Sequence, residues 1–111
     1  MNYFDCHTDA LTEISDDETL LSNGRDLDLT RVGAFAESYA QIFALWEDVA
    51  RFPLEETDER FMACYQRAMG LLRDQSERVS LVRSAAEMHA SLEAGLGAAF
   101  LSIEDVSFMG G

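Results

Sequence analysis

Residues 39–46 form an almost uninterrupted apolar run, and two further short apolar runs, residues 3–6 and 97–103, lie near the two ends of the sequence. The length of the central run and its aromatic content are typical of a strand that is buried on both faces, as strands in parallel sheets are. Segments long enough for helices separate the runs. Buried strands that alternate with helices predict an α/β fold with a parallel sheet and right-handed crossovers.

Helical patterns occupy much of the chain between the second and third apolar runs. The clearest helix is predicted over residues 57–76, with Thr57 as its N-cap, because apolar residues recur there at spacings of three and four. A capping box at Ser84 and Glu87 opens a second helix that runs to residue 93, and residues 79–82 are predicted to be extended. The apolar stripe of the long helix consists of Phe61, Cys64, Tyr65, Ala68, Leu71 and Leu72, and its polar side carries Glu59, Arg60, Gln66, Arg67, Arg73 and Asp74.

Some segments allow two interpretations. Ser15 and Glu18 have the spacing of a capping box, so they begin either a short helix or an acidic loop. Residues 26–33 are either a short helix or a connector. The central apolar run has a buried helix as its alternative, because three alanines recur there at helical spacing, namely Ala36, Ala40 and Ala44.

The composition argues against several classes of protein. The 111 residues suit one domain or part of one, and a hydrophobic content of 48% is enough for a core. The net charge of −13 argues against nucleic-acid and anionic-membrane partners, since both need a basic surface. Cys6 and Cys64 form no dense pattern, so no disulfide framework is expected and a reducing cytoplasm is the simpler location. The start of the chain lacks the features of a signal peptide, and no apolar run reaches the length of about 18 residues that spans a membrane.

Potential metal ligands follow the first and the last apolar run. Asp5, His7 and Asp9 alternate, so a regular strand would place them on one face, and Glu104 ends the last run. Sites in parallel α/β folds form at the carboxyl ends of strands, where His7, Asp9 and Glu104 would meet. An imidazole and two carboxylates suit zinc, manganese or iron. On spacing alone, a chance arrangement of polar residues is the simpler explanation. The other histidine, His89, is expected on the surface of the second helix.

The same three runs, with their polar ends, resemble a known family. Residues 4–11 read Phe-Asp-Cys-His-Thr-Asp-Ala-Leu and resemble the opening strand of the renal (membrane) dipeptidase family, Asp-x-His-x-Asp-x-Leu. Residues 39–46 resemble its second strand, in which a Gln-aromatic run is usual, and residues 98–104 resemble its third strand, which ends in Ile-Glu-Gly. The three matches occur in the order and at the intervals of the family and span essentially the whole sequence.

This resemblance implies a fold, an activity and a set of site residues. The fold is a TIM (β/α)8 barrel, of which residues 1–111 would be a single partial domain that supplies the first β/α units. The activity is the hydrolysis of dipeptides at a binuclear metal centre, usually of zinc, in which paired cations activate water. His7 and Asp9 would bind one metal, Glu104 would bridge both metals, and Gln41 and Trp46 would lie near the substrate.

The sequence also departs from the family pattern. Asp105 and Val106 follow Glu104, where the family has a pair of glycines. A (β/α)8 barrel needs about 200 residues or more. The remaining metal ligands of the family, its acid/base aspartate and its substrate-binding arginine would lie beyond the third strand. The chain is therefore expected to be the first part of a barrel, with no catalytic residue of its own and with little or no turnover alone.

Two other functions fit part of the pattern. One is a non-catalytic assembly module of the same fold, in which a homo-oligomer would cover the open edge of the sheet. The other is a metallohydrolase barrel of the polymerase-and-histidinol-phosphatase type, a phosphoesterase whose first strand carries Asp-x-His-x-His. Asp5 and His7 fit that motif, whereas Asp9 stands where a histidine is expected. Under the dipeptidase interpretation the expected partner is a small peptide substrate.

Overall fold

The computed structural model describes residues 2–104, which form a mixed α/β fold. The elements, in chain order, are β1 (Asn2–Thr8), α1 (Ala10–Glu13), α2 (Leu29–Phe35), β2 (Ser38–Leu45), the 3-10 turn η1 (Val49–Arg51), α3 (Leu54–Asp74), β3 (Val79–Leu81), α4 (Ala85–Glu93) and β4 (Gly97–Ile103). The predicted strand at 39–46 is present within one residue at each end, so its helical alternative is wrong. The predicted strand over residues 97–103 has the bounds of β4, and residues 26–33 contribute to the short helix α2.

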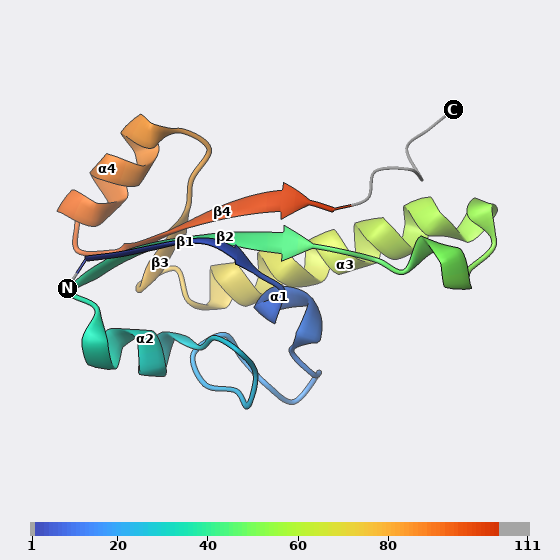
Figure 1. The fold of residues 1–111 in the computed structure, drawn as a ribbon, viewed down its shortest axis with the longest axis horizontal. Coiled ribbons are helices and arrows are strands. Elements are labelled where there is room, and N and C mark those ends of the chain that lie inside the picture. The colour runs from blue at the N-terminus through green and yellow to red at the C-terminus, as the bar shows by residue number, and fades with distance from the viewer. Residues whose placement is uncertain (1, 105–111) are drawn as a thin grey trace.

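The four strands form one sheet in the order β1-β2-β4-β3, and every neighbouring pair is parallel. The central pair, β2 and β4, is in continuous register from Ala40 opposite Ala98 to Leu45 opposite Ile103. The short β3 pairs only with the first part of β4, up to Ala99. The parallel sheet predicted from the apolar runs is therefore confirmed, and the carboxyl ends of β1, β2 and β4 point toward the same end of the molecule (Figure 1).

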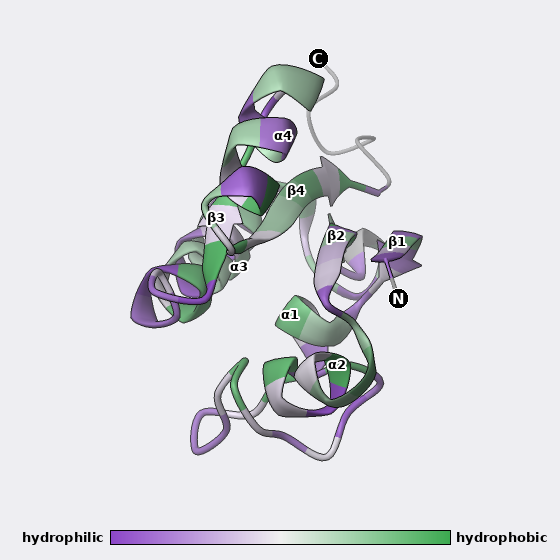
Figure 2. Cartoon of the chain, turned by 90° about the vertical axis from the view of Figure 1, so that its left-hand side faces the viewer, coloured by the Kyte–Doolittle hydropathy of each residue, from purple (hydrophilic) through white to green (hydrophobic). Residues whose placement is uncertain are grey.

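Helices cover both faces of this sheet. In Figure 1, α1 and α2 lie below the sheet and α4 lies above it, and α3 packs into the same apolar cluster as α1 and α2. In the view of Figure 2, α4 likewise lies beside β4 and β3, on the far side from α1 and α2. Crossovers of one hand explain this division. The connections from β1 to β2 and from β2 to β3 advance across the sheet, whereas the connection from β3 to β4 runs back, so its helix falls on the opposite face.

The core lies mainly between the sheet and the helices α1, α2 and α3. Phe43 and Leu45 of β2 and Leu11 of α1 are at most 1% exposed, and they belong to the larger of two apolar clusters. The predicted stripe of α3 enters this cluster through its buried residues Phe61, Ala68 and Leu72 and its half-buried residues Cys64, Tyr65 and Leu71. A smaller cluster under α4 contains Ala40, Val82 and Ala98. None of the described helices combines the length and the apolar character needed to cross a membrane.

β1 differs from the buried strand expected over residues 3–6. It is an edge strand, with only β2 beside it, and it extends to Thr8. Tyr3 packs against the core and meets Phe35 of α2 edge-on, with ring centroids 5.6 Å apart. Phe4, on the other face, is 53% exposed, and Cys6 is exposed as well. An apolar run of this kind predicts that one face of the strand is buried. It does not predict whether a helix covers the other face or whether another strand pairs with the free edge.

The predicted caps are partly right. Ser84 caps α4 by accepting a hydrogen bond from the backbone N–H of Glu87, as expected, and Gly95 follows with a φ of 80°. In contrast, α3 begins at Leu54, three residues before Thr57, and Pro53 occupies the N-cap position. Thr57 is buried in the first turn, where its hydroxyl donates to the carbonyl of Leu54. Proline in this position fits the start of a helix because it has no N–H to leave unpaired.

No helix follows the capping-box pattern at Ser15. The Glu18 carboxylate accepts hydrogen bonds from the backbone N–H groups of Ser15 and Gly24, at 3.1 and 3.0 Å, and forms an ion pair with Arg25. These bonds stabilise the loop between α1 and α2, where a helix was the alternative. They lower the pKa of Glu18 to about 2, chiefly through the backbone N–H of Gly24 and then that of Ser15. The acidic-loop interpretation is therefore the correct one.

Candidate metal centre

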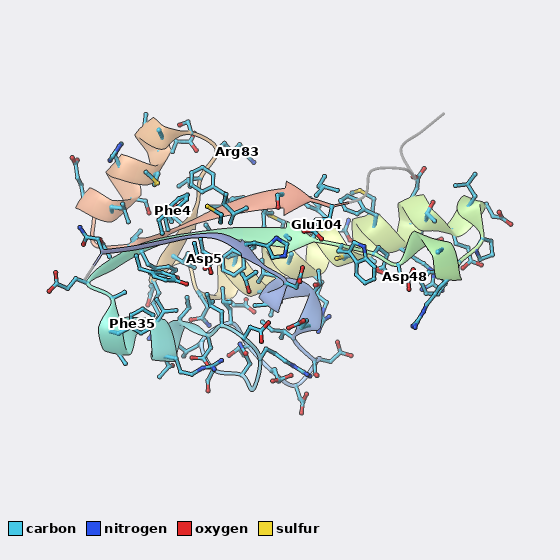
Figure 3. The ribbon with its side chains drawn as sticks, in the orientation of Figure 1. Phe4, Asp5, Phe35, Asp48, Arg83 and Glu104 are labelled. Atoms are coloured by element: carbon cyan, nitrogen blue, oxygen red, sulfur yellow. The ribbon has the colours of Figure 1, made fainter. Side chains whose placement is uncertain are left out.

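The three predicted ligands come from the carboxyl ends of two strands that are not neighbours. His7 lies near the end of β1, Asp9 follows as the N-cap residue of α1, and Glu104 comes directly after β4. The backbone N–H of Glu104 donates to the carbonyl of Leu45, so pairing with β2 continues past the end of β4 and positions the glutamate (Figure 3). The parallel sheet thus brings the two ends of the sequence to one place.

The side chains of these residues converge on one another. Glu104 Oε1 lies 3.2 Å from His7 Nδ1, and Asp9 Oδ2 lies 3.4 Å from His7 Nε2. One ligand atom from each residue falls within 4.8 Å of the other two. The side chains of His7, Asp9 and Glu104 are 52%, 41% and 43% exposed, so a cation could enter directly from solvent. This cluster is the one that the sequence predicts.

Asp5 does not join the cluster, contrary to the regular alternation expected from the sequence. Asp5 pairs with Gln41 and Thr8 pairs with Phe43, so β1 contains one more residue than β2 over this interval. Since Gln41 and Phe43 share one face of β2, their partners Asp5 and Thr8 share a face too. This bulge places His7 on the other face, away from Asp5.

Asp5 instead supports the backbone of the bulge. Its carboxylate accepts a hydrogen bond from the backbone N–H of His7 at 3.2 Å and one from the hydroxyl of Tyr3 at 3.0 Å. Burial alone would raise the pKa of Asp5, but these two hydrogen bonds, with smaller contributions from Gln41 and the backbone of Cys6, hold it below its usual value. The hydrogen bond between the Tyr3 hydroxyl and Asp5 raises the pKa of Tyr3. Asp5 therefore acts on the site through the position of His7.

The donor set fits a single divalent cation. One imidazole and two carboxylates are suitable ligands for zinc, manganese or iron, and three protein ligands leave open positions for water or substrate. The described residues offer these three ligands in one place. The predicted assignment of two metals needs further ligands, which the described part of the chain does not place here. Asp105 and Val106, where the sequence departs from the family, lie outside the described residues. His89 is exposed on α4, as predicted.

The two residues predicted near the substrate have different environments. Gln41 is fully buried within the sheet, where its side-chain amide donates to the carbonyl of Ile42 at 3.1 Å. Its side chain does not reach the surface of the described residues, and its place near the substrate stays a prediction. Trp46, directly after β2, is 46% exposed and lines two adjoining pockets.

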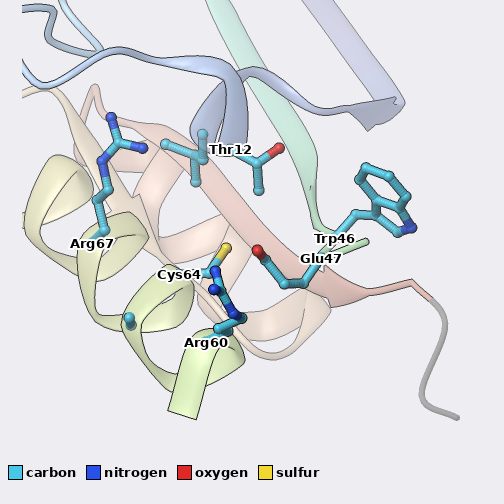
Figure 4. Close-up of a pocket in the computed structure, with 8 residues that line it drawn as sticks. Thr12, Trp46, Glu47, Arg60, Cys64 and Arg67 are labelled. Atoms are coloured by element: carbon cyan, nitrogen blue, oxygen red, sulfur yellow. The ribbon is translucent and has the colours of Figure 1, made fainter. Parts of the chain in front are cut away.

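These two pockets form a cleft between α1, α3 and the segment after β2, close to the candidate metal centre. The first, of about 300 Å³, is lined by Leu11, Thr12, Trp46, Glu47, Arg60, Ala63, Cys64 and Arg67. The second, of about 400 Å³, shares Thr12, Trp46 and Glu47 with it and reaches Asp9. Figure 4 shows Arg60 and Cys64 side by side, with the carboxylate of Glu47 facing them. Burial, and then the charge of Glu47, raises the pKa of the Cys64 thiol.

Sequence reasoning missed this cleft as a site. It placed Arg60 and Arg67 on the polar side of the long helix, which is correct but does not say what that side faces. The available signal was their separation of seven residues, which places both guanidinium groups on one stripe of the helix. The partner surface, α1 and Glu47, is distant in sequence and could not be inferred from spacing.

No protein-family model matches the sequence, and no curated protein sequence matches it.

Proposed function

We propose that this chain is part of a metal-dependent hydrolase that cleaves dipeptides, and that His7, Asp9 and Glu104 hold a divalent cation, with zinc as the first candidate. One observation carries the proposal. Three residues chosen from the sequence as metal ligands, from its two ends, have their ligand atoms within 4.8 Å of one another.

The parallel sheet of the mixed α/β fold supports the proposal. The cluster lies at the carboxyl ends of parallel strands, where α/β barrels have their active sites. We propose further that β1, β2 and β4 are barrel strands, in that order. The strands of a (β/α)8 barrel are arranged in chain order, whereas β3 precedes β4 in the sequence but lies beyond it in the sheet. In this interpretation β3 is therefore an additional strand. β3 pairs with only the first three residues of β4, Gly97 to Ala99, so the rest of that edge would be available to a further barrel strand.

The geometry allows two roles for Glu104. In the first, it is a ligand that bridges two cations, as the resemblance implies. In the second, Asp9 and His7 Nε2 would hold one cation, and Glu104 would accept a hydrogen bond from Nδ1–H, which would orient the imidazole. A bound divalent cation would supply polarisation of the substrate carbonyl and activation of water. Exchange of Glu104 for glutamine separates the two roles, since a glutamine oxygen still accepts the hydrogen bond but is a poor bridge.

Metal binding is the direct test. Isothermal titration of the chelator-treated protein with Zn²⁺ and Mn²⁺ should give a stoichiometry of one ion per chain. His7→Ala and Asp9→Ala should abolish this binding. His89→Ala, which removes the exposed histidine of α4, should leave it unchanged. Equal affinity in wild type and His7→Ala would refute the site.

Activity assays test the reaction class. The 111-residue chain and any longer natural form of the protein should be assayed with dipeptides and with phosphate monoesters. The proposal expects little or no turnover from the 111 residues, which supply three ligands, and dipeptide hydrolysis from a form that contains the remaining ligands. Hydrolysis of phosphate esters without peptide hydrolysis would favour the phosphoesterase alternative. Dipeptide turnover by the 111 residues alone, abolished by His7→Ala, would contradict the need for further ligands.

One observation favours a second candidate function, that of an assembly module. Phe4 on β1 and Ile103 at the end of β4 are 53% and 44% exposed, an unusual position for large apolar side chains on a sheet. If these side chains are buried between subunits of an oligomer, their exposure in the single chain is explained without a catalytic function. Sedimentation of the chain distinguishes the cases. An oligomer that Phe4→Ser dissociates supports the module, and a monomer that binds zinc supports the hydrolase.

A further inference from the structure

The cleft beside Trp46 has opposite charges at its two ends. The pocket that reaches Asp9 is bordered by the carboxylates of Glu13, Glu47 and Asp48 as well, against the single guanidinium of Arg51, which forms an ion pair with Asp48 at 3.0 Å. The adjoining pocket is bordered by two guanidinium groups, those of Arg60 and Arg67, against the shared carboxylate of Glu47. The acidic end is therefore the end nearer the candidate metal centre.

The cationic end stands out in this chain. Only eight residues are basic against 21 acidic ones, and all eight are arginines. Two of them border one small pocket although the surrounding protein is strongly acidic. An anionic ligand is repelled by most of this surface, so a pocket with two arginines is the region where a single carboxylate can be held.

Arg60 is the better anchor of the two. The guanidinium of Arg67 is already engaged, since it donates to the carbonyl of Ile14 and lies 3.6 Å from the carboxylate of Asp16. Arg60 instead stacks on the ring of Phe52, 3.4 Å from the centroid, and only its Nε faces Glu56, at 3.4 Å. Stacking fixes the plane of the guanidinium, and the hydrogen bond to Glu56 uses Nε and neither of the Nη groups.

We propose that this cleft binds a small zwitterion of the amino-acid or dipeptide kind, with its carboxylate on Arg60 and its ammonium group at the acidic end, near Glu13 and Asp48. The guanidinium can take a carboxylate through two parallel hydrogen bonds. Volumes of about 300 and 400 Å³ are at the small end for ligand pockets, which suits one or two residues. Trp46, which lines both pockets, offers apolar surface between the charged ends.

The inference rests on the proposed function for the identity of the zwitterion as a dipeptide, whereas the charge distribution comes from the described residues alone. In that setting, Arg60 is a specificity-determining residue that orients the substrate. The carboxyl end of the dipeptide points toward α3, and its amino end points toward Asp9. A dianion such as inorganic phosphate is a poorer fit, because Glu47 borders the same pocket as Arg60.

Trp46 supplies a direct readout, because it is the single tryptophan of the chain and lines both pockets. The chelator-treated protein is titrated with glycyl-leucine, with its C-terminal amide and with inorganic phosphate, and the intrinsic fluorescence is followed. Calorimetry of the same titrations detects binding that leaves the fluorescence unchanged. Glycyl-leucine should bind saturably. Its amide should bind about tenfold or more weakly, as expected for the loss of a hydrogen-bonded charge.

Arg60→Gln should weaken binding of glycyl-leucine by the same factor and should leave the affinity for the amide unchanged, because the two changes remove one interaction. Arg73→Gln, on the same helix but outside the cleft, is the matched control and should bind both ligands as wild type does. Cooperative unfolding of each variant shows that it is folded. An equal loss for peptide and amide in Arg60→Gln, tighter binding of phosphate than of glycyl-leucine, or no peptide binding by either method would overturn the inference.

The outcomes also separate this inference from the proposed function. The peptide titrations use chelator-treated protein, so binding in the cleft is measured without a metal. Peptide binding that depends on Arg60 in a protein that binds no metal would refute the metal centre and retain the cleft. Metal binding that depends on His7, without peptide binding that depends on Arg60, would retain the metal centre and refute the cleft.

Discussion

Glu104 Oε1 lies 3.2 Å from His7 Nδ1, although the two residues belong to opposite ends of the sequence. Their strands do not touch, because β2 lies between β1 and β4. The contact is therefore made across the end of β2, by side chains that extend past the sheet. A cation held by both residues, together with Asp9, would cross-link the first and last strands that the structure describes.

Such a cross-link predicts that metal stabilises the fold. At a Zn²⁺ concentration about one hundred times the dissociation constant, the free energy of unfolding should rise by about 2.7 kcal/mol, because the cation binds the folded state only. Urea denaturation with and without zinc measures the change. His7→Ala and Glu104→Ala should unfold at the same urea concentration in both conditions, and His89→Ala should keep the full response. A response that survives in His7→Ala would place the cation elsewhere.

A second prediction concerns the close contact between β2 and β4. A Cβ atom at Gly97 would clash with Cε1 of Tyr39, whose ring is packed in the core. Gly97→Ala should therefore lower the free energy of unfolding by about 1–3 kcal/mol, the usual cost of overpacking. Urea denaturation measures this loss.

Gly70→Ala is the matched control for that experiment. Gly70 lies inside α3, and a Cβ atom there would meet nothing within 4 Å. This exchange should stabilise the protein by about 0.5–1 kcal/mol through helix propensity. If Gly97→Ala were as stable as wild type, the Tyr39 ring would have to leave its place at no cost, and the packing described for β2 and β4 would be wrong.

A third prediction concerns acid. The pKa of Glu18 is about 2 in the folded protein, against an ordinary value of 4.5. Because the folded-state pKa is depressed, the contribution of Glu18 to stability is present above about pH 4.5 and is lost as the pH falls toward 2. Glu18→Gln should therefore be less stable than wild type at pH 6, and the difference should shrink between pH 4.5 and pH 2.5. Chemical denaturation across that range measures it, and a difference that is independent of pH would contradict the assignment.

A fourth prediction concerns the two thiols. Burial and the neighbouring charge of Glu47 raise the pKa of Cys64, whereas Cys6 is exposed on β1. Iodoacetamide at pH 8 should modify Cys6 first, and the rate at Cys64 should rise more steeply as the pH increases, because the thiolate is the reactive form. Peptide mass spectrometry resolves the two sites. A ligand in the cleft should protect Cys64 and leave Cys6 reactive. Faster reaction of Cys64 than of Cys6 at pH 8 would contradict the environment described here.

The elements that the sequence predicts well are those whose signals are local. The strand from Gly97 to Ile103 and the central strand β2 were predicted because a short, nearly continuous apolar run is typical of a buried parallel strand, although a buried helix was the alternative for β2. The cap of α4 was identified because Ser84 and Glu87 are three residues apart and bond to each other. The three ligands of the candidate metal centre follow the same logic, since residues after parallel strands collect at one edge of the sheet.

The errors arise where a distant segment decides the outcome. The strand at residues 3–6 was expected to be buried, yet β1 lies at the edge of the sheet with Phe4 exposed. Asp5 was grouped with His7, but a bulge against β2 separates them. Helix α3 begins at Leu54 and not at Thr57, because Pro53 starts the helix and the Thr57 hydroxyl bonds within the first turn. The first two features depend on β2, which is distant in sequence, whereas the start of α3 has a local signal in Pro53.

The sequence by itself therefore determined the fold class, the two central strands and the identity of the three candidate ligands, because hydrophobic period and capping chemistry act over a few residues. The tertiary structure alone decided the strand order, the face on which α4 lies and the bulge that turns His7 toward Glu104. It also decided that Arg60 and Trp46 share a cleft next to Asp9. These properties depend on which surfaces are buried against each other, and burial is settled only when all the strands and helices compete for the same core.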